Sequence, residues 1–246
     1  MRVDVLGVGF DNVTMDEAVE RAISMMEEEG PHLVVTPNPE MIQQAERDPE
    51  FAEILAQADL AIPDGVGVIY AAKLLGTPLK GRVPGVDLAT RLMERMAQSG
   101  KRLYLLGAKP GVAEMAAVNL SAAHPGLVVC GTHDGYFQED DPSVVEDIRK
   151  CRADVVFVCL GAFKQERWAA VHGKETGARL FLGLGGALDV FSGQVERAPV
   201  MWQKLGIEWL YRTIKEPFRI KRVAKLPLVL VDALGHRLRR GKGGKR

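Results

Sequence analysis

Several residues that could carry acid–base chemistry follow short apolar runs in the first two thirds of the chain. The clearest is Asp64, which stands between Pro63 and Gly65 directly after the apolar run 60–62. A carboxylate there acts as a general base if it faces a cleft. An Asp at such a position also commonly caps the following helix, which the pattern predicts from about Val66. The residues alone leave both interpretations open.

Hydroxyl, amide and cationic side chains follow other apolar runs in the same way. Thr36 and Asn38 come after one run, where they could contact a ligand or simply stabilise a turn and start a helix. Lys164 and Gln165 open a predicted helix after the most apolar run, 155–160. Backbone N–H groups and a lysine at a helix start suit an anionic ligand, although a solvated first turn has the same composition.

The glycine-rich loops do not complete a nucleotide-binding fingerprint. The loop that starts at Gly7 has Asn12 where the third glycine should stand, and Gly183-Leu184-Gly185-Gly186 is followed by Leu188. Neither is G-x-G-x-x-G, and no Gly-Lys pair is followed by Ser or Thr as in a P-loop. A nicotinamide-dependent oxidoreductase therefore stays only as an alternative.

Metal and redox chemistry have little support in the sequence. The five histidines lack ligand spacing, no two Asp residues are separated by one position, and the three cysteines form no C-x-x-C pair. The acidic run 139–141 is expected to cap a helix at Pro142. We therefore expect no metal cofactor, and Arg and Lys must offset any phosphate charge. The scarce, unpaired cysteines also indicate a reducing compartment.

The charge is distributed unevenly although the formal net charge is zero. Residues 201–246 hold 13 basic and 3 acidic side chains, so the tail should seek an anionic partner. The longest apolar stretch there, Leu226 to Leu234, is far shorter than the ~20 residues of a membrane-spanning helix. The N-terminus has no pattern of a cleavable leader.

A basic face lies beside an apolar stripe in the predicted helices of this tail. The basic face holds Arg212, Lys215, Arg219 and Arg222, and the stripe includes Leu228 and Val231. An ordinary solvated face is one explanation, and an anionic membrane surface or a lipid-linked diphosphate is the other. Nucleic acid is disfavoured as a partner because aromatic residues are few and no binding motif is present. Self-association is left open by the sequence.

Apolar runs alternate with amphipathic segments through the first 185 residues. The alternation predicts a Rossmann-like α/β fold with a doubly wound, largely parallel sheet, because strands buried on both faces are continuously apolar. The chain is predicted to divide into a catalytic body, residues 1–199, and a basic helical appendage, residues 200–246, with helices at about 200–215 and 218–240. The predicted strands are Val3 to Val8, Leu33 to Thr36, Asp59 to Ile62, Leu103 to Leu106, Leu127 to Cys130, Val155 to Leu160 and Leu180 to Leu184.

Seven short blocks occur in order along nearly the whole chain. They are Thr36-Pro37-Asn38, Ile62-Pro63-Asp64-Gly65, Arg82-Val83-Pro84-Gly85-Val86-Asp87, Leu160-Gly161-x-x-Lys164-Gln165-Glu166, Gly183-x-Gly185-Gly186-x-x-Asp189, Arg197-Ala198-Pro199 and Glu208-Trp209-Leu210-x-Arg212. Taken together, these blocks resemble the WecG/TagA/CpsF glycosyltransferase family. The resemblance implies an inverting glycosyltransferase on the cytoplasmic face of the membrane, which with the missing metal-ligand patterns we expect to be metal-independent. It implies transfer of a sugar, in most members N-acetylmannosamine, from UDP to undecaprenyl-diphosphate-linked N-acetylglucosamine for teichoic acid or a related surface polysaccharide. Some relatives use N-acetylmannosamine uronic acid, glucose or galactose.

The resemblance also assigns roles to residues at matching positions. Asp64 matches the family's proposed catalytic base, and Thr36 a neighbouring residue needed for activity. Asn38, Arg82 and Gln165 match positions that line the donor pocket, and Lys164 is retained beside Gln165. Arg212, Arg219 and Arg222 match appendage arginines that close over the site. The chain departs from the family at Phe163, where most members have proline.

Overall fold

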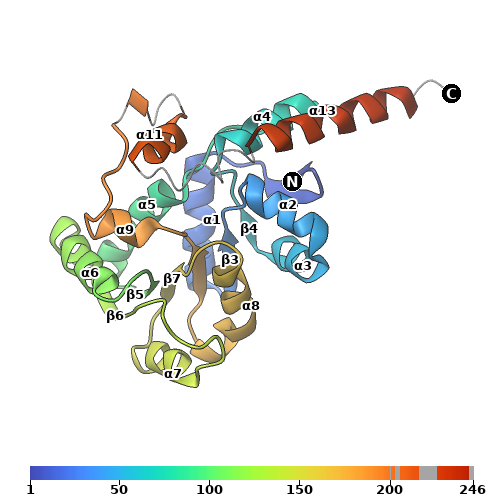
Figure 1. Ribbon diagram of the computed structural model, residues 1–246. Helices are drawn as coiled ribbons and strands as arrows, with labels where there is room; N and C mark the ends of the chain where they lie inside the picture. The colour runs from blue at the N-terminus through green and yellow to red at the C-terminus, as the bar shows by residue number, and fades with distance from the viewer. Residues whose placement is uncertain (200, 203–205, 216–225, 244–246) are drawn as a thin grey trace.

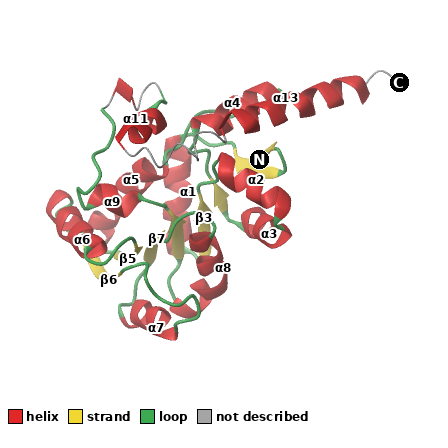
Figure 2. Ribbon diagram, viewed as in Figure 1, coloured by secondary structure: helices red, strands yellow, loops and turns green. Residues whose placement is uncertain are grey.

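A six-stranded parallel sheet forms the centre of the protein (Figures 1 and 2), seen here in a computed structural model that describes residues 1–199, 201–202, 206–215 and 226–243. The strand order is β4-β3-β8-β7-β5-β6, with every neighbouring pair parallel. The predicted doubly wound sheet is therefore confirmed. The strands are β3 (His32–Val35), β4 (Leu60–Ala61), β5 (Arg102–Gly107), β6 (Val128–His133), β7 (Val155–Cys159) and β8 (Leu180–Gly183).

Helices cover both faces of this sheet, which explains why its strands are continuously apolar. In β5, Leu103 and Leu105 pack with one core cluster, while Tyr104 and Leu106 pack with another on the opposite face. Burial of both faces removes the alternation of polar and apolar residues that a half-exposed strand shows. One face is covered by α1 (Met15–Glu27), α5 (Gly85–Ser99), α6 (Val112–Ala123) and α9 (Ala187–Phe191), and the other by α2 (Pro39–Arg47), α3 (Pro49–Gln57), α7 (Pro142–Lys150) and α8 (Lys164–Thr176).

The N-terminal segment differs from the prediction of one strand at Val3 to Val8. It is an antiparallel hairpin of β1 (Arg2–Val5) and β2 (Val8–Asp11). The chain turns at Leu6 and Gly7, whose φ angles of 55° and 86° are those of a two-residue turn with both residues in the left-handed region. The prediction was wrong because a leucine occupies a turn position that glycine or asparagine usually marks.

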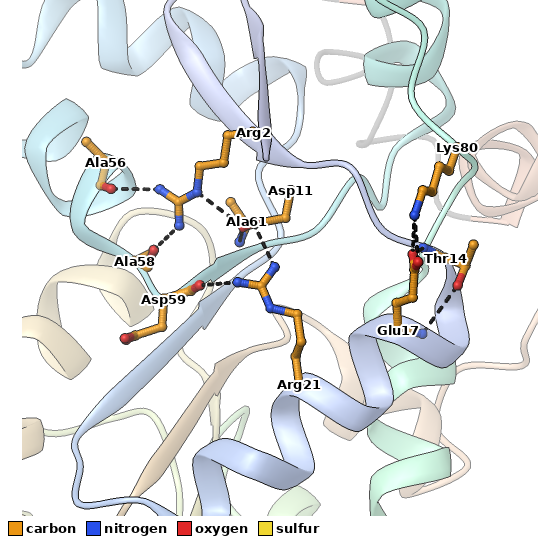
Figure 3. Close-up of polar contacts among 10 residues, drawn as sticks. All are labelled: Arg2, Asp11, Thr14, Glu17, Arg21, Ala56, Ala58, Asp59, Ala61 and Lys80. Carbon is orange, nitrogen blue, oxygen red and sulfur yellow. Dashed lines mark hydrogen bonds and ion pairs between the residues drawn. The ribbon is translucent and has the colours of Figure 1, made fainter.

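A buried carboxylate joins this hairpin to the edge of the central sheet (Figure 3). Asp11, only 3% exposed, accepts hydrogen bonds from Arg2 Nε at 3.2 Å, from Arg21 Nη1 at 2.8 Å and from the Ala61 backbone N–H at 2.9 Å. Ala61 lies in β4, an edge strand whose outward N–H groups have no strand partner. Asp11 therefore holds the hairpin and caps the edge of the sheet at the same point.

The C-terminal elements follow the sheet in sequence. They are α11 (Glu208–Lys215), near α5, and α13 (Leu226–Gly243), which runs beside α4 (Val66–Leu75) and extends past it (Figure 1). Leu228 and Val231 of the predicted apolar stripe are 53% and 66% exposed and do not pack on the body. Val229 and Ala233, four residues apart on another face, are fully buried instead. Residues 218–225 of the second predicted helix lie outside the described residues.

Replacement of Asp11 by alanine is expected to destabilise the fold by about 2–4 kcal/mol, because it leaves a buried N–H without its acceptor and two arginines without their shared anion. Chemical denaturation of the two proteins measures this difference. The matched control is Asp16→Ala, whose 81% exposed carboxylate pairs with Arg91 at the surface and should change stability by less than about 1 kcal/mol. Equal effects of the two substitutions would contradict the role given to Asp11.

Candidate active site

The candidate site residues come together at the carboxyl ends of four adjacent strands. Thr36 and Asn38 follow β3, Asp64 follows β4, Gln165 follows β7, and the segment 184–186 follows β8. These strands are neighbours in the sheet, in the order β4-β3-β8-β7. Ligands of open parallel sheets bind at this edge because loops rather than strands surround it.

A pocket of about 310 Å³ opens above these loops, between the body and α11. Its wall includes Asn38, Asp64 and Arg82 among the predicted residues. The helix α11 and the turn before it contribute Gly206, Glu208, Trp209 and Thr213. The C-terminal segment therefore supplies part of the wall of this pocket.

Asp64 faces this pocket and does not cap the following helix. The N-cap of α4 is Gly65, and no side chain forms a capping hydrogen bond there. The Asp64 side chain is 39% exposed, and its Oδ1 lies 4.0 Å from Arg82 Nη2. Arg82 Nε also donates to the Asp64 carbonyl at 2.8 Å. The structure therefore does not support a capping role for Asp64 and places the residue in the pocket wall beside Arg82.

Asn38 has the helix-starting role that its sequence position allows, and it also lies in the pocket wall. Its Oδ1 accepts hydrogen bonds from the N–H groups of Glu40 and Met41, at 2.9 and 3.1 Å, so it caps α2. The same residue lines the pocket. Because the cap uses the side-chain oxygen, the amide NH₂ is the group that could donate to a bound substrate.

Gln165 does not line the pocket and is fixed in a buried hydrogen-bonded pair with Glu166. Its Oε1 accepts from the Gly185 backbone N–H at 2.9 Å, and its Nε2 donates to Glu166 Oε1 at 2.7 Å. Glu166 Oε2 accepts from the Phe163 backbone N–H at 2.8 Å. Gln165 and Glu166 are 2% and 0% exposed. Together they tie the loop after β7 to the loop after β8.

Two small residues make room for these groups. A Cβ on Gly183 would lie 2.9 Å from both Gln165 Nε2 and Glu166 Oε1, which leaves no space for any other residue. A Cβ on Gly85 would lie 3.0 Å from Thr36 Cγ2, at the start of α5. Thr36 itself donates from Oγ1 to the Gly183 carbonyl at 3.0 Å. The loops after β3, β7 and β8 are therefore connected by side-chain hydrogen bonds.

The predicted cations are placed differently from one another. Lys164 is exposed at the first turn of α8 and does not line the pocket. Arg212 belongs to α11, whose neighbouring residues Trp209 and Thr213 line the pocket. Arg219 and Arg222 lie outside the described residues.

Phe163 adopts a backbone conformation that proline cannot. Its φ is +74°, whereas the proline ring fixes φ near −65°. Its N–H donates to Glu166, and proline has no N–H. Its ring packs edge-to-face on Phe51, with 5.2 Å between centroids. A loop with proline at this position must therefore follow a different path.

Two charged residues of the pocket were not predicted as site residues. Glu208 Oε2 lies 2.5 Å from Arg82 Nη2, and Glu208 Oε1 lies 3.6 Å from Arg197 Nε. Arg197 also pairs with Asp87 at 2.5 Å. Arg197 and Glu208 occur within the blocks quoted above, but only the fold brings them to Arg82.

Within the ranges that the structure describes, no three His, Cys, Asp or Glu side chains gather so that they could hold a metal ion. The acidic run before Pro142 has the predicted capping role, since Asp141 caps α7 by accepting from the Ser143 N–H at 2.9 Å. No described helix is both long enough and apolar enough to span a bilayer.

Known proteins similar to this chain were found by two comparisons. The family model described as "Glycosyl transferase WecG/TagA/CpsF family" matches residues 3–243. Proteins named N-acetylglucosaminyldiphosphoundecaprenol N-acetyl-beta-D-mannosaminyltransferase, from Staphylococcus aureus strains MW2 and MRSA252, are 34% identical over 231 residues. The alignments cover 93% of this chain and 91% of each relative. These matches do not favour the oxidoreductase alternative.

The stability of the protein is expected to depend on the ionisation of Glu166. Burial raises the pKa of this carboxyl from 4.5 to about 7, so the folded protein keeps a proton that the unfolded chain releases above pH 4.5. The contribution of Glu166 to stability therefore falls as the pH rises from about 4.5 to 7, by at most about 3 kcal/mol, and is constant above that range.

Glu166→Gln isolates this effect because glutamine does not titrate. Unfolding free energies of both proteins, measured by denaturant titration at several pH values, should show a steeper decline for the wild type between pH 4.5 and 7. Parallel pH profiles would contradict the assignment.

Proposed function

Because the chain belongs to the WecG/TagA/CpsF family of glycosyltransferases, we propose that it transfers N-acetylmannosamine from UDP to undecaprenyl-diphosphate-linked N-acetylglucosamine. The product would enter the synthesis of teichoic acid or a related surface polysaccharide. The observation that carries the proposal is the position of Asp64, which faces a pocket at the carboxyl edge of the sheet with Arg82 beside it.

Asp64 acts as the general base of an inverting transfer. Its carboxylate takes the proton of the acceptor hydroxyl as the hydroxyl oxygen bonds to the anomeric carbon of the donor sugar. The bond between that carbon and the diphosphate oxygen breaks in the same step, and UDP leaves. Thr36 supports this step through the Gly183 carbonyl, which fixes the loop next to Asp64.

Cationic side chains offset the charge of the leaving diphosphate without a metal ion. Arg82 lies in the pocket, and Arg212 is carried by the helix that closes the pocket wall. Arg219 and Arg222 complete this group. Asn38 contacts the donor through its amide NH₂, and Gln165 holds the loops after β7 and β8 together. The exposed Lys164 attracts the anionic substrate at long range.

The appendage, residues 200–246, places the enzyme on its lipid-linked acceptor. Its many basic residues favour the anionic inner face of the cell membrane, and the exposed Leu228, Val231 and Leu234 on α13 supply apolar contacts. The enzyme is thus a peripheral membrane protein that works from the cytoplasm.

Asp64→Asn is expected to lower kcat by roughly 10²- to 10⁴-fold, because asparagine keeps the shape of the side chain but cannot accept the proton. The assay measures UDP release in the presence of the lipid-linked acceptor and UDP-N-acetylmannosamine. The melting temperature should stay within a few degrees of the wild type, since Asp64 is not a buried cap. The surface variant Asp16→Asn is the control. Full turnover by Asp64→Asn would remove the base from the mechanism.

Chelation of divalent ions is expected to leave turnover unchanged, because arginines supply the charge that a metal would otherwise supply. The measurement compares initial rates in buffer with EDTA, with EDTA and excess Mg²⁺, and with neither. A rate that collapses in EDTA and returns with Mg²⁺ would show that the transfer requires a metal.

A further inference from the structure

The pocket holds a carboxylate between two arginines in the region where the proposed substrates would bring phosphate. Arg82 and Arg197 approach the two oxygens of Glu208 from the body, at 2.5 and 3.6 Å. The side chains are 22%, 27% and 15% exposed, respectively, so all three are largely removed from water. Guanidinium groups bind carboxylates and phosphates alike, so a carboxylate held between two of them occupies a position that also suits a phosphate group.

The contact of Glu208 with the two arginines affects how well the pocket can bind a diphosphate. Of the described residues that line the pocket, Glu40, Asp64 and Glu208 are acidic, and Arg82 and Arg197 are basic. A diphosphate would therefore enter a site whose acidic side chains outnumber its basic ones, with both guanidinium groups already engaged. Departure of Glu208 from the arginines removes one negative charge from the pocket and opens one binding position on each guanidinium group, while Asp87 stays paired with Arg197.

Resting on the proposed function, we propose that Arg82 and Arg197 form a diphosphate-binding pair, and that Glu208 occupies this pair until a substrate diphosphate displaces it. Arg197 is then a substrate-binding residue in addition to those that the family resemblance assigns. Glu208 then competes with the substrate diphosphate for the two arginines. The displaced side chain belongs to the first residue of α11, so the exchange takes place where the C-terminal segment meets the body.

The diphosphate could be that of the nucleotide donor or that of the lipid-linked acceptor. Both present the same group to a pair of guanidinium ions. Binding measurements with UDP, with uridine and with a short-chain prenyl-diphosphate-N-acetylglucosamine separate the two sources, since uridine has the base and the ribose without the phosphates.

Isothermal titration calorimetry on the full chain tests the proposal with Glu208→Gln, which keeps the shape of the side chain and removes its charge. This variant should bind UDP, the acceptor analogue or both roughly tenfold more tightly than the wild type. Its affinity for uridine should not change. Glu20→Gln, which removes a surface carboxylate paired with Arg95, is the control and should bind like the wild type. Tighter binding of UDP alone assigns the pair to the donor, and of the analogue alone to the acceptor.

Arg197→Gln provides a second test that does not depend on the behaviour of the Glu208 variant. It should weaken binding of the same diphosphate ligand roughly tenfold and leave uridine unaffected. In the double variant the gain from Glu208→Gln should largely disappear, because one of the released cations is missing. Melting curves of all variants check that the fold is kept.

The proposal is overturned if Glu208→Gln binds UDP and the acceptor analogue no more tightly than the wild type, or if uridine gains equally. Failure of the proposed function has a different signature. In that case the wild-type protein itself binds neither UDP nor the acceptor analogue.

Discussion

The buried hydrogen-bonded pair of Gln165 and Glu166 sets the geometry on which the candidate site depends. Through this pair the loop after β7 is fixed to the Gly185 N–H of the loop after β8, while Thr36 binds the neighbouring Gly183 carbonyl from the loop after β3. Loops at the edge of a parallel sheet would otherwise be joined only through their strands. Cross-linking by side chains holds these loops in one arrangement before any substrate arrives, which lowers the cost of ordering them during catalysis.

The buried pair of Gln165 and Glu166 places a carboxyl group in the protein interior, which is energetically unfavourable. The Glu166 carboxyl group has no exposed surface, and this burial raises its pKa even though the Gln165 amide and the Phe163 N–H donate hydrogen bonds to it. The pair also requires glycine at 183, where a Cβ would collide with both side chains. Phe163 belongs to the same set, because its positive φ and its N–H are what bring the loop to Glu166. A sequence with proline at 163 would have to satisfy Glu166 in another way.

The sequence predicted the parts of this protein that depend on local patterns. Continuous apolar runs gave the parallel sheet, and the order of the strands then brought Thr36, Asn38, Asp64 and Gln165 to one edge. The hairpin at Leu6 escaped prediction because its turn lacks the usual residues, and the stripe on α13 was assigned to a face that the structure leaves exposed. The pairing of Arg82 with Glu208 spans 126 residues, so no spacing rule could reveal it. Both residues occur in the blocks that resemble the family, but the resemblance assigned a role only to Arg82 and did not indicate that it contacts Glu208.

The contact of Glu208 with Arg82 and Arg197 offers a reason why a pocket proposed to bind diphosphate is lined by the carboxylates of Glu40, Asp64 and Glu208. Two guanidinium groups largely removed from water need counter-ions when no phosphate is present, and Asp87 supplies one of them to Arg197. Glu208 contacts both arginines from a helix outside the sheet, so under the proposal it can leave without disturbing the loops that Gln165 and Glu166 hold. Replacement of this carboxylate by a diphosphate would then change the contact of α11 with the body, whereas the hydrogen bonds among those loops would stay. Binding of a diphosphate and the contact of the C-terminal segment with the body would therefore change together, because both depend on the same two arginines.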